Sequence, residues 1–367
     1  MKKYLSIICA AAMMLSACDK KEDNAVSTKP IVKIGATLPL SGDAAIFGNM
    51  SKEAMMMVLQ KWQKQDTKYN YKLIFSDDMV KFQQAALNAN RFINIDGVKA
   101  ILSIWGTVDR VVDEIADKNN VISMSCTLGK GKLPPLAICN ETANEDYAEL
   151  LTKELKKHHA QKIALIILNG NANVNLGDYL QEYFSTHGLE VTDYIKTNAD
   201  MKDYRMIITK AEQKNPDYYI MQMGAPGMDI FVKQFMEMKP SGKLTTVWNF
   251  AELSSDILPL IEGQWFVRGE DGSEEFKSEF KKITGTEPNS CTANSYDNLD
   301  MFIWAYENTP VHPGETFPYN KDVIQKIKSI RQWKGAVGKF DVDKQGLVRN
   351  KPSVQIYENG NFVKLKD

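Results

Sequence analysis

The sequence predicts an α/β protein made of two doubly wound lobes, and three observations carry this prediction. Short apolar strands alternate with helices of about 10–15 residues, which is typical of a parallel sheet with helices on both faces. The alternation runs twice along the chain, with a break after Asn140. The chain of 367 residues also exceeds the length of one ordinary core, so about two domains are expected.

The chain begins with a removable export signal. Residues 1–17 join Lys2 and Lys3 to an apolar run too short to span a bilayer, and small residues precede Cys18. This pattern resembles the bacterial lipoprotein signal, in which the cysteine is lipidated and becomes the first residue of the mature chain. Asp19 resembles the inner-membrane retention mark of proteobacterial members. A plain secretory signal or a short buried helix is the alternative.

Residues 18–30 are polar and without an apolar period, which predicts a flexible tether behind the lipidated cysteine. In the first series, β-branched and apolar runs predict strands, and apolar residues at helical spacing predict helices. The expected strands are 31–37, 71–75, 98–104 and 121–125, and the expected helices are 48–64, 82–95 and 108–117.

The elements of the second series are predicted from the same patterns of apolar residues. Its expected helices are 144–157, 176–187, 202–214 and 228–238, and its expected strands are 163–168, 189–195, 218–221, 244–248 and 265–268. From residue 274 the pattern becomes helical, at 274–283, 293–307 and 321–330. Short strands around Phe340, 354–357 and 362–365 close the chain, the last two separated by the turn 358–361.

Composition excludes several classes of function. Without Lys2 and Lys3, the 45 Lys and Arg become 43 against 46 Asp and Glu, a net charge of −3 that gives no electrostatic case for nucleic acid. No apolar stretch after the signal approaches the roughly 20 residues of a membrane helix. The body is therefore expected to be soluble and anchored at one end only.

Common catalytic and cofactor motifs are missing. The first turn, 40–48, lacks the spacing of a dinucleotide-binding loop, and there is no phosphate-binding loop or nucleophile elbow. The four histidines show no metal-binding spacing. No enzyme activity, cofactor or metal is therefore expected.

Three cysteines remain in the mature chain after Cys18, an odd number for an oxidising compartment. A bridge between Cys126 and Cys139 would close a short loop, and free buried thiols are the alternative. Cys291 has no partner in this scheme.

In an open α/β sheet, ligands bind beyond the carboxyl ends of the strands. The loops of the first series supply the candidate binding residues Ser41, Phe47, Trp105, Gly106, Thr107, Ser125, Cys126 and Thr127. Hydroxyls and free N–H groups at a helix start suit a carboxylate, and aromatic walls suit an apolar or planar part of a ligand. The alternatives are that Thr107 caps helix 108–117 and that the two aromatic rings pack beneath a loop.

The corresponding loops of the second series, 169–175, 224–226 and 249–252, offer amides and one acid. Their candidates are Asn175, Ala225 and Glu252. A buried ammonium group without a partner acid would be costly, so an amino-acid ligand requires an acid that reaches it. Glu252, Glu141 or Glu145 could be that acid.

Segment 34–42, followed by Phe47, Gly48 and a helix, resembles the opening of type I periplasmic binding proteins of the leucine/isoleucine/valine-binding family. Further similar features, in order along most of residues 31–367, are Asp77-Asp78, Gln84-Ala85-Ala86, Tyr296-Asp297, the closing segment 335–341 and Gly346. The sequence departs from the family at 173–176, where a tyrosine before a glycine is common, and at Cys126, where alanine or glycine is more usual. These departures favour a small ligand with an anionic group over leucine itself.

The resemblance implies two Rossmann-like lobes joined by a three-segment hinge, 31–141 plus 270–335 and 142–269 plus 336–367. It implies that a ligand is trapped between the lobes by hinge closure, and that the closed form docks to an ABC permease in the inner membrane. Thr107, Ser125 and Thr127 resemble hydroxyl loops that bind the carboxylate of an amino acid. Phe47 stands where the family often has an aromatic contact.

These features together predict a lipid-anchored, monomeric solute-binding protein of an ABC transporter in the cell envelope, facing the periplasm or the cell exterior. Its ligand would be a small carboxylate-bearing molecule such as an amino acid. The alternative is a regulatory or sensory envelope lipoprotein that uses the same fold to contact another protein.

Overall fold

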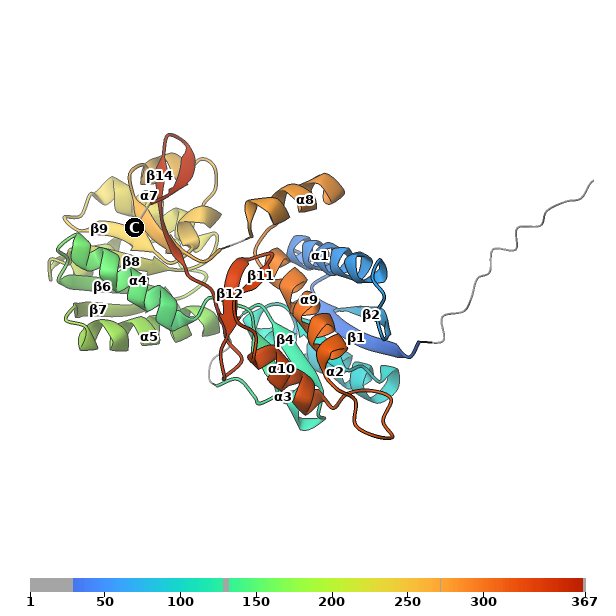
Figure 1. The fold of residues 1–367 in the computed structure, drawn as a ribbon. Coiled ribbons are helices and arrows are strands. Elements are labelled where there is room, and N and C mark those ends of the chain that lie inside the picture. Colours follow the sequence, from blue (N-terminus) through green and yellow to red (C-terminus); the bar gives the residue numbers. More distant parts are fainter. Residues whose placement is uncertain (1–28, 128–131, 271, 366–367) are drawn as a thin grey trace, which may run out of the picture.

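The computed structural model describes residues 29–127, 132–270 and 272–365. The export signal 1–17, Cys18 and the tether up to residue 28 lie outside these residues. Within them the chain forms two α/β lobes that lie side by side, which confirms the predicted fold class (Figure 1). Among the described helices, none is both long enough and apolar enough to cross a bilayer.

The first lobe is built on a parallel sheet of five strands in the order β2-β1-β3-β4-β5. Its first elements are β1 (Ile31–Leu38), α1 (Ala45–Gln63), β2 (Asn70–Asp77), α2 (Phe82–Arg91), the π-helical turn η1 (Phe92–Asp96), β3 (Ala100–Ser103), α3 (Gly106–Lys118), β4 (Ile122–Ser125) and β5 (Ala137–Cys139). The chain later returns to this lobe with α8 (Glu274–Thr284), α9 (Thr292–Asn308), α10 (Asn320–Lys328), β11 (Trp333–Gly335), β12 (Gly338–Val342) and β13 (Val348–Arg349).

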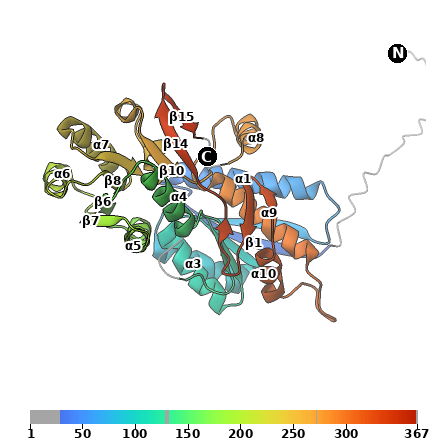
Figure 2. The same ribbon diagram turned by 60° about the vertical axis from the view of Figure 1, so that its left-hand side comes forward.

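The second lobe is built on a four-stranded parallel sheet in the order β7-β6-β8-β9. Its elements are α4 (Asn144–Lys157), β6 (Lys162–Leu168), α5 (Asn171–Thr186), β7 (Glu190–Thr197), α6 (Arg205–Glu212), β8 (Tyr218–Gln222), α7 (Gly227–Met238), β9 (Lys243–Thr246), the 3₁₀ turns η2 (Asn249–Glu252) and η3 (Leu258–Ile261), β10 (Trp265–Arg268), β14 (Ser353–Glu358) and β15 (Asn361–Lys364). A bridge between Val247 and Val267 places β10 beside the end of this sheet, and β10, β14 and β15 form an antiparallel sheet (Figure 2).

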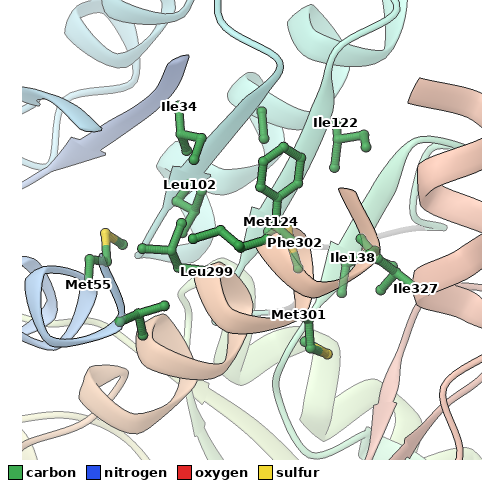
Figure 3. Packing of buried hydrophobic residues seen from close by; sticks show 14 of the residues in the cluster. Ile34, Met55, Leu102, Ile122, Met124, Ile138, Leu299, Met301, Phe302 and Ile327 are labelled. Carbon is green, nitrogen blue, oxygen red and sulfur yellow. The ribbon is translucent and has the colours of Figure 1, made fainter. Parts of the chain in front are cut away.

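Alternate residues of each central strand face opposite layers of helices, as the pleat requires. On β3, Ala100 and Leu102 belong to the core under α1, α8, α9 and α10, whereas Ile101 belongs to the core under α2 and α3. Figure 3 shows the first of these cores, where Leu299 and Phe302 of α9 pack among apolar strand residues. Both faces of the sheet are therefore dry, and only strand ends and loops remain for a ligand.

The chain crosses between the lobes three times, from β5 to α4, from β10 to α8 and from β13 to β14. Ala336, Phe340, Val342 and Val348 belong to the core of the first lobe, so β11, β12 and β13 pack there. The division expected from the sequence places the second lobe's last segment at 336–367, whereas by packing its start falls after β13.

Cys126 forms a disulfide with Cys291, and Cys139 is a buried free thiol. The bridge between Cys126 and Cys139 that the sequence left open is therefore wrong, and the free-thiol alternative holds for Cys139. Register explains the outcome, because Ser125 of β4 pairs with Cys139 of the parallel strand β5. Cys139 thus shares the face of Ser125, and Cys126, one residue on, points to the opposite face, where α9 packs.

Candidate functional site

A cavity of about 290 Å³ lies between the lobes. Both lobes and all three crossing segments contribute to its wall. The residues of this interlobe cavity are Cys126, Thr127, Glu141, Thr142, Tyr147, Asn173, Gly224, Trp248, Asn249, Ala251, Glu252, Arg268, Gly269, Glu270, Ser290, Cys291, Asn294 and Asn350. Because its wall belongs to both lobes, a relative rotation of the lobes would change its shape.

The first-lobe wall is held by a covalent tie. The disulfide joins the loop after β4 to Cys291, the residue just before α9, and both cysteines line the cavity. Asn294, on the first turn of α9, donates from Nδ2 to the carbonyl of Asn140 over 2.6 Å. The loop, the helix start and the first crossing segment therefore form one connected wall.

The crossing segments are in close contact with one another. The Thr142 hydroxyl donates to Oδ1 of Asn350 over 2.5 Å, which links the first and third crossings. Gly269 of the second crossing is in close contact with the first crossing and with α4: a Cβ there would lie 2.6 Å from the Thr142 hydroxyl oxygen and 2.5 Å from the Tyr147 hydroxyl oxygen. Only glycine fits this position without displacing its neighbours.

An aromatic pair forms part of the second-lobe wall. The rings of Tyr147 and Trp248 meet edge to face with centroids 5.8 Å apart. Trp248 has a left-handed backbone (φ 59°) between β9 and η2, and the Asn249 side chain that follows accepts the backbone N–H of Met223 over 3.1 Å. These contacts hold the end of β9 against the end of β8, so the wall is preorganised.

Charges converge on the second-lobe side of the cavity. Arg268, at the end of β10, is the one cation among the described lining residues, and Glu141, Glu252 and Glu270 are the acids. Burial lowers the pKa of the Arg268 guanidinium, an effect that the charge of Glu252 opposes. Desolvation raises the pKa of the Glu252 carboxyl and Arg268 opposes that shift, and Glu252 is an exposed residue of the cavity wall.

Glu270 is neutralised by Lys364, whose Nζ lies 2.6 Å from its Oε1. The pair Arg268 and Glu252 thus places one positive and one negative group beside the same cavity, with Glu141 as a second acid. Such a site can hold a small molecule that carries a carboxylate together with a hydrogen-bond donor.

Of the residues expected from the sequence, Cys126, Thr127 and Glu252 line the interlobe cavity. Among the three acids considered for an ammonium group, Glu141 also lines it, whereas Glu145 is paired with Arg349 at 3.1 Å.

Ser41, Phe47, Trp105, Gly106 and Thr107 do not line the cavity. The Ser41 hydroxyl donates to Asp77, and the ring of Phe47 packs edge to face on Trp105 with centroids 5.5 Å apart. Thr107 is not a helix cap, because α3 begins one residue earlier at Gly106 and Trp105 holds the cap position. The alternative of Thr107 as the cap is therefore wrong, and Thr107 is exposed on the first turn.

Ser125, Asn175 and Ala225 each lie next to or near a lining residue without lining the cavity themselves. Ser125 is fully buried beneath Cys126 and Thr127. Helix α5 begins at Asn171, earlier than expected, so Asn173 faces the cavity and Asn175 lies about 200° further around the helix. Ala225 is exposed, and its neighbour Gly224 lines the wall.

The sequence reasoning missed Arg268, Tyr147 and Trp248. A charged residue at the end of the apolar strand Trp265–Arg268 was a usable signal for Arg268, because strand ends are where ligands bind. Tyr147 sits at helical spacing among apolar residues and carries no signal that separates it from the core. Among the described residues, no cluster of three or more potential metal ligands occurs.

A sequence model of the family described as periplasmic binding protein matches residues 31–358. No curated protein matches the sequence at a significant level.

Solved structures of the same architecture cover about nine-tenths of the chain. A leucine-binding protein of Thermotoga maritima superimposes with a TM-score of 0.72 at 18% identity, covering 91% of this chain and 98% of its own. A branched-chain amino acid ABC transporter periplasmic ligand-binding protein of Burkholderia xenovorans gives 0.78 at 13% identity, with 91% and 94% covered. A solute-binding protein of an ABC transporter of Rhodopseudomonas palustris, in complex with benzoate, gives 0.74 at 14% identity, with 91% and 95% covered.

Proposed function

Since the chain belongs to the periplasmic binding protein family, we propose that it is the lipid-anchored solute-binding protein of an ABC transporter, and that it binds a small carboxylate-bearing ligand between its lobes. Proteins of this family bind solutes for transporters and are not enzymes, and they act outside the cytoplasm. The observation that carries the proposal for this chain is the interlobe cavity, whose wall is shared by both lobes and all three crossings.

The chemistry of the cavity supports a carboxylate. Arg268 presents a guanidinium whose planar donors match a carboxylate, and the partly desolvated setting strengthens such a charge-assisted hydrogen bond. Trp248 and Tyr147 supply an aromatic surface for an apolar or planar part of the ligand. A volume of about 290 Å³ lies at the small end for ligand sites and suits an amino acid or an aromatic acid.

The three crossings support hinge closure as the mechanism. A ligand that touches both lobes at once binds the closed arrangement better than the open one, and this difference in affinity shifts the population toward the closed state. The closed state would then be the form that docks to the permease.

Lipid anchoring rests on the sequence alone, because Cys18 lies outside the described residues. Radiolabelled palmitate should be incorporated by the full-length chain and not by Cys18→Ala. A product cleaved elsewhere and free of lipid would leave a plain secreted protein.

Ligand binding is tested by the melting temperature of the protein against L-leucine, benzoate and a broad panel of small acids, since a ligand that binds only the folded state raises it by mass action. We expect at least one carboxylate to do so, and Arg268→Met to weaken its binding by tenfold or more through the lost charge-assisted bond. Arg205→Met is the matched control, because Arg205 lies on α6 and pairs with Glu237 at 3.1 Å, away from the cavity. A panel without any stabilising compound, with no small molecule co-purifying, would contradict the proposal.

A further inference from the structure

Thr127 lines the first-lobe wall of the interlobe cavity, and its hydroxyl has a partner on α3 behind this wall. Its Oγ1 donates to Oδ2 of Asp109, in the first turn of α3. The backbone N–H of Thr127 is directed at the same carboxylate. Both hydrogen-bond donors of Thr127 therefore serve Asp109 and not the cavity.

The single proton of the Thr127 hydroxyl limits the hydrogen bonds that Thr127 can offer a ligand. A threonine hydroxyl has one proton and two lone pairs, whereas an ionised carboxylate can only accept. While Asp109 is ionised, the single proton of Thr127 is used, and only its lone pairs remain for the cavity. A ligand carboxylate, itself an acceptor, then finds no donor on the Thr127 side chain.

We propose that Asp109 is a positioning residue that sets the polarity of Thr127 toward the ligand. With Asp109 ionised, Thr127 accepts a hydrogen bond from an ammonium or amide N–H of the ligand. With Asp109 protonated, the acid donates to Oγ1, and the hydroxyl proton of Thr127 turns to the cavity, where it suits a carboxylate. The inference rests on the proposed solute-binding function and gives the ligand a direction: its donor end meets Thr127, and its carboxylate lies toward Arg268.

The surroundings of Asp109 allow both states near neutral pH. Asp109 is 1% exposed, and burial raises its pKa to about 7 against the opposing effects of Thr127 and Ser103, which favour the charged form. The titratable groups that interact electrostatically with Asp109 are Asp113 on α3, Asp78 after β2 and Cys139 on β5. The helices α2 and α5 also pack against α3, and Arg91 and Asp178 are charged residues of these helices. Arg91 is engaged by Ser76 and Asp96, and Asp178 by Tyr194 and Lys196.

The hydrogen bond itself is tested in the ligand-free protein by ¹³C NMR of aspartate side chains, with the Asp109 signal identified by its loss in Asp109→Asn. We expect a titration midpoint between about pH 6 and 8. Thr127→Val removes the donor to the charged form, so the midpoint should rise by about one pH unit or more, and Thr127→Ser should restore it. If Thr127→Val does not fold, Thr127→Ala poses the same question. An unchanged midpoint in the variant that folds overturns the proposal.

The polarity toward the ligand is tested with L-leucine and 4-methylpentanoate, which differs from it only by lacking the ammonium group. Affinities are compared at pH 5.5 and pH 8.0 in the wild-type protein and in Asp109→Asn. We expect the preference for L-leucine to be at least threefold greater at pH 8.0 than at pH 5.5, and this difference to vanish in Asp109→Asn. Tighter binding of 4-methylpentanoate than of L-leucine at pH 8.0 overturns the proposal. If neither compound binds at either pH, the NMR titration alone decides the proposal, and the panel of small acids decides the proposed transport function.

Discussion

Removing the disulfide between Cys126 and Cys291 should destabilise the first lobe strongly. The bond joins residues 165 positions apart, so it restricts a long segment of the unfolded chain. In the chain-entropy treatment, a loop of that length corresponds to about 5 kcal/mol of stability at 25 °C. Native strain and residual structure in the unfolded state lower this figure, so we expect a loss of about 2–5 kcal/mol.

The assay is guanidinium unfolding of the wild-type protein with and without dithiothreitol, followed by intrinsic fluorescence. The unfolding midpoint should fall on reduction, and the double variant Cys126→Ser with Cys291→Ser should unfold at the midpoint of the reduced protein. Dithiothreitol must leave the double variant unchanged, because Cys139 is already a free thiol. Equal midpoints for oxidised and reduced wild-type protein would refute the argument from loop length.

Two further predictions concern the crossings and the buried acids. Gly269→Ala at the second crossing should lower the melting temperature and weaken ligand binding, because its Cβ would lie 2.5 Å from the Tyr147 hydroxyl oxygen. Melting curves that match the wild type would show that the crossing accommodates the added methyl group. The second prediction rests on burial, which raises the folded-state pKa of Asp113 to about 8, above the unfolded value near 4. Asp113 in the folded state therefore holds an extra proton between these values. Its contribution to stability is greatest at acid pH and falls by up to about 1.4 kcal/mol per pH unit as pH rises to about 8. Asp113→Asn should flatten this dependence in urea unfolding at pH 5 and pH 7.5, and an identical slope in both proteins would contradict it.

The sequence predicts the layers of the fold well because they depend on local periodicity. Alternating apolar runs identify β1, β3, β6 and β8, and each is found within a few residues of its expected place. The short strands β5, β11 and β13 are missed, because two or three residues carry no detectable period.

The disulfide illustrates what local patterns cannot supply. Cys139 is the nearer partner of Cys126 along the chain, but register puts the two side chains on opposite faces of the sheet. Cys291 is far away in sequence and becomes the neighbour only when the chain returns to the first lobe with α9. Such a contact is decided by topology, which the spacing of cysteines does not reveal.

The candidate site, too, can be predicted from the sequence only in part. Loops at strand ends lead to Thr127 and Glu252, because the carboxyl edge of a parallel sheet is a general place for ligands. The role of Thr127 cannot be derived from its loop, since the use of its proton depends on Asp109, a residue on a different element. A hydroxyl identifies a polar position, and only its partners decide whether it donates or accepts.

Ion pairs between the lobes also affect how the lobes could move relative to each other. Arg349, at the end of β13 in the first lobe, contacts Glu145 and Asp146 at the start of α4 in the second, over 3.1 and 2.7 Å. These ion pairs bridge the lobes immediately beside the first and third crossings, where a rotation about the crossings displaces atoms least. In the proposed closure they can therefore persist, and the contacts that would form or break lie further out, on the cavity wall. In the proposed closure, the charged groups at the hinge would therefore stay in contact near the axis, and Arg268, Glu252 and Thr127 would respond to the ligand.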